Sequence, residues 1–441
     1  MGRGAPMGDA EAAADKHGPP SQPATFPPPV ARTIDWLERS FATYYKDHPP
    51  PPPDRFTRRE FGFILWPDKP GPPPFVRHRA YDTAARFHNY LAWKGPHSAY
   101  YSTAYYRRPG EMKMVDKQWL AAELIFDLDA DHLAEAEAAK ARGDEMPIDE
   151  QLRLVKQQFI KLLDEFLCGD LGIDPAHVWI TFSGGRGYHA HVTDPRLMAL
   201  DAKGRREIVD YITGKVPAAK GSDQPDLAHF VWKEAVEVRG TGRFARPVTT
   251  ERIHPVTAPG WHGRMTRALV GALQTNVLDA SRDDARAWLL QLEGVGDKSA
   301  DRFLTDFDAA RLRRIGEGYL EQGQVVKRVA HHVLKQAALP LAKGETDEPV
   351  TADIKRLIRL PGSLHGKSGL RVVTLTRDAL DDFDPFVDAV AFPADAVAFT
   401  PRGDAELTLG GETVRVHAGE ATQVPMHHAV WWCARQQGTV A

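Results

Sequence analysis

The chain has 441 residues, enough for two or three structural units, and its 56 Lys or Arg against 59 Asp or Glu give a formal net charge of −3. This balance excludes a protein that binds nucleic acid over its whole surface, although a local basic groove stays compatible with it. The two cysteines, Cys168 and Cys433, exclude a disulfide framework and a four-cysteine zinc site and favour a reducing, cytoplasmic location.

The composition divides the chain into three parts. Residues 1–30 are mostly Gly, Ala and Pro, so we predict a disordered tail. Residues 31–395 mix strand and helix patterns without strict β–α–β alternation, which predicts an α+β domain with a helical insertion near 268–320. Residues 396–441 contain short alternating runs and predict a small β appendage. No stretch approaches 18 consecutive apolar residues, so we expect no membrane-spanning helix and no membrane partner.

Five segments of the main part have recognisable patterns. Residues 123–129 (ELIFDLD) read as a short apolar strand that ends in acids, and 148–167 have the spacing of an amphipathic helix. Residues 178–182 and 188–192 predict two strands on either side of a glycine-rich turn. Residues 356–375 read as a helix end, a Pro-Gly turn and a further strand.

Asp127 and Asp129 are the first candidate site residues. On a strand, side chains two residues apart share a face, with Cα atoms roughly 6.6 Å apart, so both carboxylates can approach the same divalent cations. Oxygen ligands of this kind suit Mg²⁺ or Mn²⁺ with a phosphate substrate. The alternative is a solvated strand end whose aspartates cap the next helix, and a bare Asp-x-Asp does not decide between the two.

The turn 183–187, in the segment SGGRGYHAHV, is a candidate phosphate site. Glycines let backbone N–H groups approach phosphate oxygens, and Arg186 supplies a fork of donors that matches phosphate geometry. His189 and His191 alternate onto one face of the following strand, where either can bind a triphosphate or a metal ion. The alternative is a hairpin that merely requires glycine.

Residues 353–371 form a basic segment in a nearly neutral protein. Ser363, His365 and Lys367 alternate in an extended loop, which directs them to one side, and Asp353 stands just upstream as a candidate third carboxylate. The alternative is a basic helix face followed by a tight turn. Together, the carboxylate pair, the glycine-arginine-histidine turn and this loop supply the groups needed for two-metal nucleotidyl transfer.

The sequence resembles the small catalytic subunits of archaeal DNA primases, which belong to the archaeo-eukaryotic primase superfamily. The matching motifs follow the family's order along most of the chain: REFGF at 59–63, VRHRAY at 76–81, FDLDADHL at 126–133, SGGRGYHAHV at 183–192 and DIKRLIRLPGSLHGKSGL at 353–370.

The resemblance implies roles for individual residues. Asp127, Asp129 and Asp353 would be the catalytic carboxylates that bind Mg²⁺ or Mn²⁺. Glu60 and Arg77 match family positions near the nucleotide. The phosphates of the incoming nucleotide would be held by five further side chains: Ser183, Arg186, His189, His365 and Lys367.

The resemblance also implies an architecture and partners. The family has a mixed α/β catalytic core with an RRM-like sheet, and its usual partner in a heterodimer is a large primase subunit that carries an iron–sulfur cluster. The implied activity is synthesis of short RNA primers, with DNA primers as an open option, on single-stranded DNA from NTPs or dNTPs. Two rival readings are a gap-filling primase-polymerase that extends primers with dNTPs and a DNA-binding accessory protein.

The chain departs from many relatives where they carry a zinc knuckle. Between the Asp-x-Asp pair and the glycine-rich turn, the candidate ligands are Cys168, His132 and His177. A structural zinc site usually needs four well-spaced nitrogen or sulfur ligands. We therefore predict no structural zinc.

A second departure is the segment 289–304, LLQLEGVGDKSADRFL, which fits a helix-hairpin-helix pattern. Its Gly-Val-Gly turn exposes backbone N–H groups at the start of a helix, an arrangement that favours a DNA phosphate without reading sequence. We predict DNA contact at Gly294, Gly296 and Lys298. The alternative is an ordinary helical hairpin whose glycines permit the tight turn.

Overall fold

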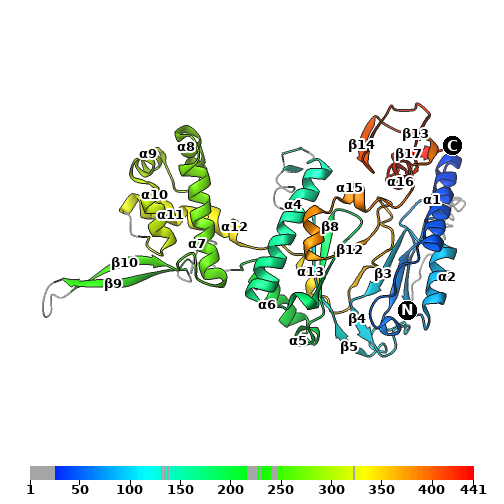
Figure 1. Ribbon diagram of the computed structural model, residues 1–441, viewed down its shortest axis with the longest axis horizontal. Helices are drawn as coiled ribbons and strands as arrows, with labels where there is room; N and C mark the ends of the chain where they lie inside the picture. Colours follow the sequence, from blue (N-terminus) through cyan, green and yellow to red (C-terminus); the bar gives the residue numbers. More distant parts are fainter. Residues whose placement is uncertain are drawn as a thin grey trace, which may run out of the picture.

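A computed structural model describes residues 25–130, 133, 136, 139, 140, 142–144, 146–215, 227, 230–239, 246–320 and 323–441, with the backbone alone for 236–239 and 246–248. These residues form two lobes joined by a narrow connection (Figure 1). We call the described residues within 25–215 and 343–441 the main lobe, and those within 230–342 the helical lobe.

The main lobe begins with helix α1 (Pro28–Asp47), which is followed by the short helix η1 (Phe56–Arg58). Residues 1–24 of the predicted disordered tail lie outside the described residues, whereas 28–30 form the first turn of α1, so the prediction was wrong there. Proline is tolerated in a first helical turn because the N–H that it lacks would have no partner inside the helix.

The first sheet of the main lobe has four antiparallel strands in the order β11-β3-β1-β2. Residues 356–359 were predicted to end a helix, but 357–359 form an edge strand that pairs with β3, so this prediction was wrong. Pairing with a distant strand outweighed the local pattern. The strand bounds are β1 Phe61–Ile64, β2 Phe75–Arg79, β3 Ser98–Ser102 and β11 Leu357–Arg359.

The second sheet is also antiparallel and has the order β12-β7-β8-β6. The predicted strands at 123–129, 178–182 and 188–192 are confirmed, and the turn between the last two joins them as a hairpin. The pairing places Asp127 opposite His189 and Asp129 opposite Gly187. The bounds are β6 Leu124–Asp129, β7 Val178–Phe182, β8 Gly187–Val192 and β12 Val373–Leu375.

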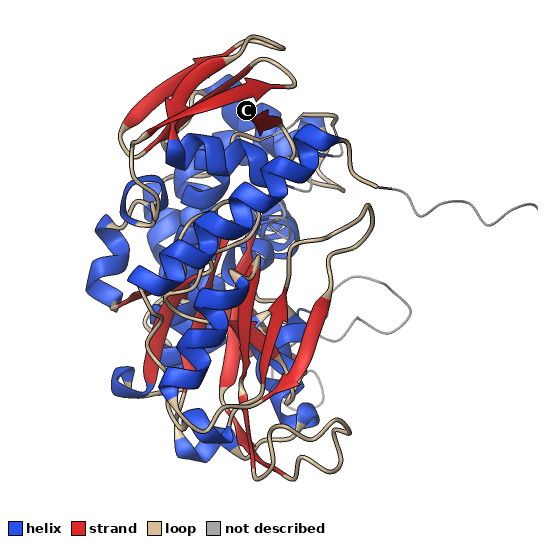
Figure 2. Ribbon diagram, turned by 90° about the vertical axis from the view of Figure 1, so that its right-hand side faces the viewer, coloured by secondary structure: helices blue, strands red, loops and turns tan. Residues whose placement is uncertain are grey.

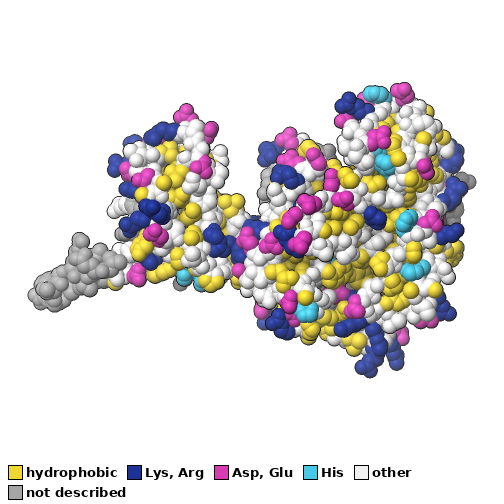
Figure 3. Space-filling model, viewed as in Figure 1, with side chains coloured by type: hydrophobic (Ala, Val, Ile, Leu, Met, Phe, Trp, Pro, Cys, Tyr) yellow, Lys and Arg dark blue, Asp and Glu magenta, His cyan; other side chains and the backbone are white. Residues whose placement is uncertain are grey.

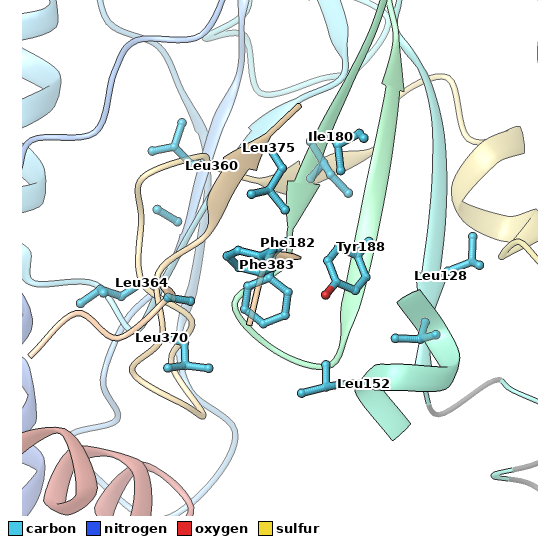
Figure 4. Close-up of a cluster of buried hydrophobic side chains, with 14 of the residues drawn as sticks. Leu128, Leu152, Ile180, Phe182, Tyr188, Leu360, Leu364, Leu370, Leu375 and Phe383 are labelled. Atoms are coloured by element: carbon cyan, nitrogen blue, oxygen red, sulfur yellow. The ribbon is translucent and has the colours of Figure 1, made fainter. Parts of the chain in front are cut away.

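Alternation along β6 and β8 separates a core face from a polar face. Leu124, Phe126 and Leu128 are buried, as the alternation predicts. Tyr188, next to His189 in sequence, packs on Phe182 and Phe383 in a cluster of apolar side chains (Figure 4). The sheet therefore presents polar groups on one face because its other face is held in the core.

Helices pack across the strands of the main lobe (Figure 2). Helix α4 lies against β6 and β8 and continues as the π-helical segment η3, so the predicted helix at 148–167 is confirmed. Helix α13 packs between α6 and β6. The remaining elements of this part are α2 Ala84–Lys94, β4 Ala104–Tyr106, β5 Trp119–Ala122, α4 Ile148–Lys161, η3 Leu162–Asp170, η4 Pro175–His177, α5 Pro195–Met198, α6 Ala202–Ile212 and α13 Glu348–Ala352.

The helical lobe has its own hydrophobic cluster, built mainly from its helices. It covers more of the chain than the predicted insertion at 268–320, because a two-stranded hairpin precedes the helices and further helices follow them. Its elements are β9 Val231–Arg239, β10 Arg246–Ile253, α7 Gly260–Leu273, η7 Gln274–Leu278, α8 Arg282–Gln291, α9 Asp297–Asp306, α10 Ala309–Gly316, α11 Gln324–Val333, η8 Leu334–Ala338 and α12 Leu339–Ala342.

The C-terminal segment contains a hairpin at 405–416, as predicted, but it is not a separate β appendage. Helix α16 packs on α1, its apolar side chains belong to the main core, and Val440 N–H donates a hydrogen bond to Thr33 Oγ1 at 3.1 Å. This helix is apolar on all sides, so no amphipathic period marked it. The elements are α14 Arg377–Asp382, α15 Pro385–Asp388, β13 Ala396–Pro401, β14 Ala405–Leu409, β15 Glu412–Val416, β16 Thr422–Pro425, α16 Met426–Ala434 and β17 Gly438–Val440.

Acidic and basic side chains are interspersed over both lobes on the face in Figure 3, in keeping with the near-neutral composition. The combination of helices with antiparallel sheets agrees with the predicted α+β class. Within the described residues, no helix has the length and apolar character that crossing a bilayer requires.

Candidate active site

A cleft of about 860 Å³ in the main lobe is lined by residues of β3 and β11 from the first sheet and of β6 and β8 from the second. The β7–β8 turn, the loop between β11 and β12 and the start of α4 complete its wall. Seven side chains that the sequence had singled out lie together here: Asp127, Asp129, Ser183, Arg186, His189, His365 and Lys367.

The carboxylates of Asp127 and Asp129 lie on one face of β6, at the end of the strand. Burial, followed by the negative charges of Asp129 and Asp347, raises the pKa of Asp127 to about 7. Such mutual repulsion indicates an excess of negative charge that a cation would relieve. The donor chemistry of this pair therefore fits a divalent metal ion.

The number of protein ligands also fits Mg²⁺. Among the described residues, no three His, Cys, Asp or Glu side chains are grouped closely enough to hold a metal ion by themselves. Mg²⁺ is usually bound by one or two carboxylates together with water and substrate phosphates, because it gives up its water reluctantly. Asp127 and Asp129 can supply the protein's share of such a site.

Asp353 does not belong to this cleft. It is exposed, and its carboxylate accepts a hydrogen bond from the backbone N–H of Lys355 at 2.8 Å, so its assignment as the third carboxylate was wrong. Asp347, at the start of α13, is the acid that lies near the pair, because its N–H donates to the Asp127 carbonyl at 2.9 Å and its charge acts on the Asp127 carboxylate.

The sequence contains one signal for Asp347. Asp-Glu-Pro at 347–349 is a typical helix start, with Asp347 at the N-cap position and proline in the first turn. Its side chain makes no capping hydrogen bond. Which of the two acids that flank α13 faces β6 depends on packing, and the sequence pattern does not specify that.

The β7–β8 turn, which adjoins the end of β6 at Asp129, and the loop 363–370 form another part of the cleft lining. The Ser183 hydroxyl accepts hydrogen bonds from the N–H groups of Gly185 (3.2 Å) and Gly187 (3.3 Å), which fixes the turn. The Ser368 hydroxyl donates to the Gly184 carbonyl and so ties the loop to the turn. Residues nearly two hundred positions apart thus form one rigid surface.

His189 and His191, which the sequence placed on one strand face, have different partners. His189 Nε2 lies 3.4 Å from Asp127 Oδ1, and burial holds the pKa of His189 well below its usual range. His191 does not line the cleft. Its Nδ1 lies 3.2 Å from the carboxylate of Glu123, which forms a buried ion pair with Arg59.

Glu60 and Arg77 were expected near the nucleotide, but neither lines the cleft. Glu60 is fully buried, with Arg77 Nε at 3.1 Å and Lys117 Nζ at 3.4 Å from its carboxylate. The Glu60 carboxylate thus lies between two cations beside β1 and β2. Their position fits a structural ion-pair group.

The cleft contains polar residues that the sequence analysis did not assign to the site. Arg356 and Arg359 belong to the basic run that was noticed as a whole, and the Arg359 guanidinium lies over the Tyr100 ring at 5.0 Å. Arg435, from the C-terminal segment, had no local signal. Burial, then the charges of Arg359, His97, Arg435 and Lys367, hold the pKa of His365 well below its usual range.

Gly294, Gly296 and Lys298 lie on the helical lobe, away from the cleft, and all three are exposed. Gly294 has a φ of +87°, and a Cβ at this position would lie 2.5 Å from the His332 ring, so backbone conformation and packing together account for glycine here. Beside it is a cavity of about 550 Å³, here called the basic pocket, lined by Glu293, Gly294, Lys327, Arg328, His331, His332, Lys335 and Gln336.

Of the residues considered for a zinc knuckle, His132 lies outside the described residues. Cys168 lies in η3, and His177 ends the short helix η4.

Comparison with known proteins gives the cleft a context. The family model described as DNA primase small subunit matches residues 126–377, from the strand with the carboxylate pair to the first residue of α14 (Arg377–Asp382). The chain belongs to the DNA primase small subunit family. The matched segment contains each predicted cleft residue, while Arg435 lies beyond it.

Curated relatives match over nearly the whole chain. The DNA primase small subunit PriS of Methanothrix thermoacetophila is 35% identical, over 92% of this chain and 98% of its own length. The PriS proteins of Halobacterium salinarum (36%, over 92% of this chain and 97% of theirs) and Methanocella arvoryzae (37%, over 88% and 94%) are similar to a comparable degree.

Proposed function

We propose that this chain is the catalytic subunit of a DNA primase, which synthesises short RNA primers on single-stranded DNA from nucleoside triphosphates by two-metal nucleotidyl transfer. The observation that carries the proposal is that one cleft brings a carboxylate pair together with a group of cationic and hydroxyl side chains. Family membership supports it. The family's RRM-like core and helical insertion are part of the same proposal.

The carboxylate pair would bind the metal ions. Two bound Mg²⁺ or Mn²⁺ ions would lower the pKa of the attacking 3′-hydroxyl and neutralise negative charge on the pyrophosphate that leaves. Asp127 and Asp129 would hold them, and Asp347 adds negative charge beside Asp127. The rigid pairing of β6 with β8 keeps this pair in place, so little reorganisation is needed when substrate arrives.

The cationic side chains of the cleft would bind the triphosphate. Arg186 presents a planar fork of donors, and Lys367 adds a mobile positive charge. His365 Nδ1 accepts a hydrogen bond from the Lys367 N–H at 3.3 Å, which assigns the proton of the neutral ring to Nε2, so this atom can donate to a phosphate oxygen. Ser183 would orient the turn that carries Arg186.

The His189 ring would position Asp127. Its Nδ1 lies 3.2 Å from Thr181 Oγ1, and Thr181 Oγ1 lies 3.4 Å from His191 Nε2, which continues the chain of contacts to Glu123. Because these groups are buried, each is held in one orientation. The effect would be a fixed direction for the carboxylate that receives the metal ion.

Template and partner contacts complete the proposal. The exposed turn with Gly294, Gly296 and Lys298 and the cations of the basic pocket would contact the phosphate backbone of the template without reading sequence. A large primase subunit would form a heterodimer with this chain. We propose no structural zinc.

Primer synthesis on circular single-stranded DNA tests the proposal. The reaction contains labelled NTPs or dNTPs, Mg²⁺ or Mn²⁺ and no primer, with wild type and Asp129→Asn side by side. Labelled oligomers from wild type, and a loss of about 1,000-fold or more in the variant, are expected, because removal of a metal ligand removes charge stabilisation from the reacting phosphate.

Three outcomes would contradict this assignment. Near wild-type activity in Asp129→Asn would refute the metal site. Extension of an annealed primer with dNTPs, but no synthesis without a primer even when the large subunit is present, would favour the gap-filling primase-polymerase. Binding of DNA without metal-dependent NTP binding would favour the accessory-protein reading.

A further inference from the structure

The C-terminal segment reaches the cleft through one side chain, Arg435. This residue follows helix α16 (Met426–Ala434), and its guanidinium lines the cleft together with Arg186, His365 and Lys367. It stacks on the Trp431 ring at 3.4 Å and donates a hydrogen bond to the Lys367 carbonyl. An arginine fork has five N–H donors, so this bond leaves others that can meet a ligand.

The charges around Arg435 are of its own sign. Burial, then the positive charge of Arg186, lower the pKa of Arg435 to about 10. The charge of Arg435 in turn helps to lower the pKa of His365. Among the described lining residues, the acids are Asp127 and Asp129 on β6, and neither contributes to the pKa shift of Arg435. Cations that are partly removed from water and face one another are a costly arrangement unless an anion joins them.

The packing of α16 holds Arg435 in this place. Gly369, in the basic loop, lies so close to α16 that a Cβ at position 369 would be 2.3 Å from Val430 Cγ1. Helix α16 is also buried against α1 and β13. The loop that carries His365 and Lys367 and the helix that carries Arg435 are therefore packed as one unit, with their cationic groups already arranged.

We propose that Arg435 binds the triphosphate of the incoming nucleotide, so that the C-terminal segment completes the nucleotide site. This inference rests on the proposed function, because it assumes that the cleft binds a nucleotide. A phosphate of the nucleic-acid backbone has the same chemistry. The triphosphate is favoured because Arg435 contacts Lys367 and lies close enough to Arg186 and His365 for their charges to act on one another.

Nucleotide binding by Arg435→Gln tests the inference. Dissociation constants for ATP and ADP with Mg²⁺, and for AMP, are measured for the full chain by calorimetry. Loss of a charge-assisted hydrogen bond to phosphate should weaken ATP binding by about 10- to 100-fold, while AMP binding changes by less than about 3-fold. Arg435→Lys, which keeps the charge and loses the fork, should give an intermediate loss.

Arg371→Gln is the matched control. Arg371 also donates a hydrogen bond to a backbone carbonyl, that of Asp388, but it does not line the cleft. The ATP affinity of the Arg371→Gln protein should equal that of wild type. If Arg435→Gln does not fold, as judged by its thermal unfolding, Arg435→Lys carries the test on its own.

The outcomes separate the inference from the function on which it rests. Wild type that binds ATP and makes primers, next to a fully active Arg435→Gln with unchanged ATP affinity, overturns the inference alone. An equal loss for ATP and AMP indicates a structural role and also overturns it. Weaker binding of a single-stranded oligonucleotide with unchanged ATP affinity assigns Arg435 to the template instead. Wild type that binds no ATP overturns the proposed function together with the inference.

Discussion

The cleft of the main lobe and the basic pocket of the helical lobe both present lysine, arginine and histidine side chains, but the surroundings of those charges differ. In the cleft, the charges are partly buried and perturb one another, as the raised pKa of Asp127 and the lowered pKa of His365 show. In the basic pocket, Glu251 lies 3.2 Å from Lys327 and 2.9 Å from His331, and Arg328 is exposed.

This difference indicates two kinds of ligand binding. Buried charges that shift one another's pKa suit a ligand that brings its own countercharges, such as a metal ion with a triphosphate. Exposed and partly neutralised cations suit a long polyanion that is attracted from a distance and read without specificity. We therefore expect the cleft to control chemistry and the helical lobe to control template affinity.

The largest effect is expected from the acids that flank α13. Asp347→Asn should lower primer synthesis by about 100-fold or more, because a negative charge beside Asp127 is lost from the proposed metal site. Asp353→Asn, on the exposed side, should stay within about 2-fold of wild type. Steady-state rates at saturating NTP measure both. A severe loss in Asp353→Asn with a mild one in Asp347→Asn would restore the sequence-based assignment.

Much of the cleft could be predicted from local patterns. Alternation on β6 placed both Asp127 and Asp129 on one face, and the Gly-rich hairpin and the extended loop presented Arg186, His365 and Lys367 toward the same space. In each case a short segment determines which way its side chains point. A period of two residues is sufficient for that.

The residues that sequence reasoning missed depend on long-range packing. Arg435 meets Lys367 across 68 positions, through a helix with no amphipathic period. Asp347 and Asp353 stand at opposite ends of α13, and the packing of this helix on β6 decides which of the two lies near Asp127. Glu60 belongs to a family motif, but its carboxylate is buried against Arg77 and Lys117 and does not line the cleft. These are tertiary effects, and no window of the sequence contains them.

A second comparison is between buried and exposed ion pairs. Burial alone raises the pKa of Glu123, but Arg59 and His191 overcome this and hold it at about 2. A carboxyl whose folded pKa is depressed stabilises the fold above its unfolded pKa, near 4.5, and loses that contribution as the pH falls toward 2.

Glu123→Gln should therefore cost on the order of 3 kcal/mol of unfolding free energy at neutral pH and progressively less below about pH 4.5. Chemical denaturation at several pH values measures it. Asp301→Asn in the helical lobe, which breaks an exposed pair with Arg286, should cost less than about 0.5 kcal/mol. Equal costs for the two variants would contradict the distinction between buried and exposed ion pairs.

The glycines of the helical hairpin give a smaller and more local effect. Gly294→Ala should destabilise the helical lobe by about 1–2 kcal/mol, because alanine is strained at this φ and meets the His332 ring. Gly296→Ala, with a φ of −98° and open space around it, should cost about 0.5 kcal/mol. Denaturant unfolding compares them. If the two are equally destabilised, packing on His332 is not what requires the first glycine.

The smallest effect is expected from the basic pocket itself. Arg328→Gln with Lys335→Gln should weaken binding of single-stranded DNA by about 5- to 10-fold at low salt and reduce the salt dependence by one or two phosphate contacts, with Mg-ATP affinity unchanged. Arg313→Gln with Arg314→Gln removes the same charge from another face of the lobe, on α10. An equal loss in this control would mean that net charge steers the template without a local site. A loss confined to the pocket variant would mean that the helical lobe holds the template by its backbone, next to the turn that the sequence had singled out.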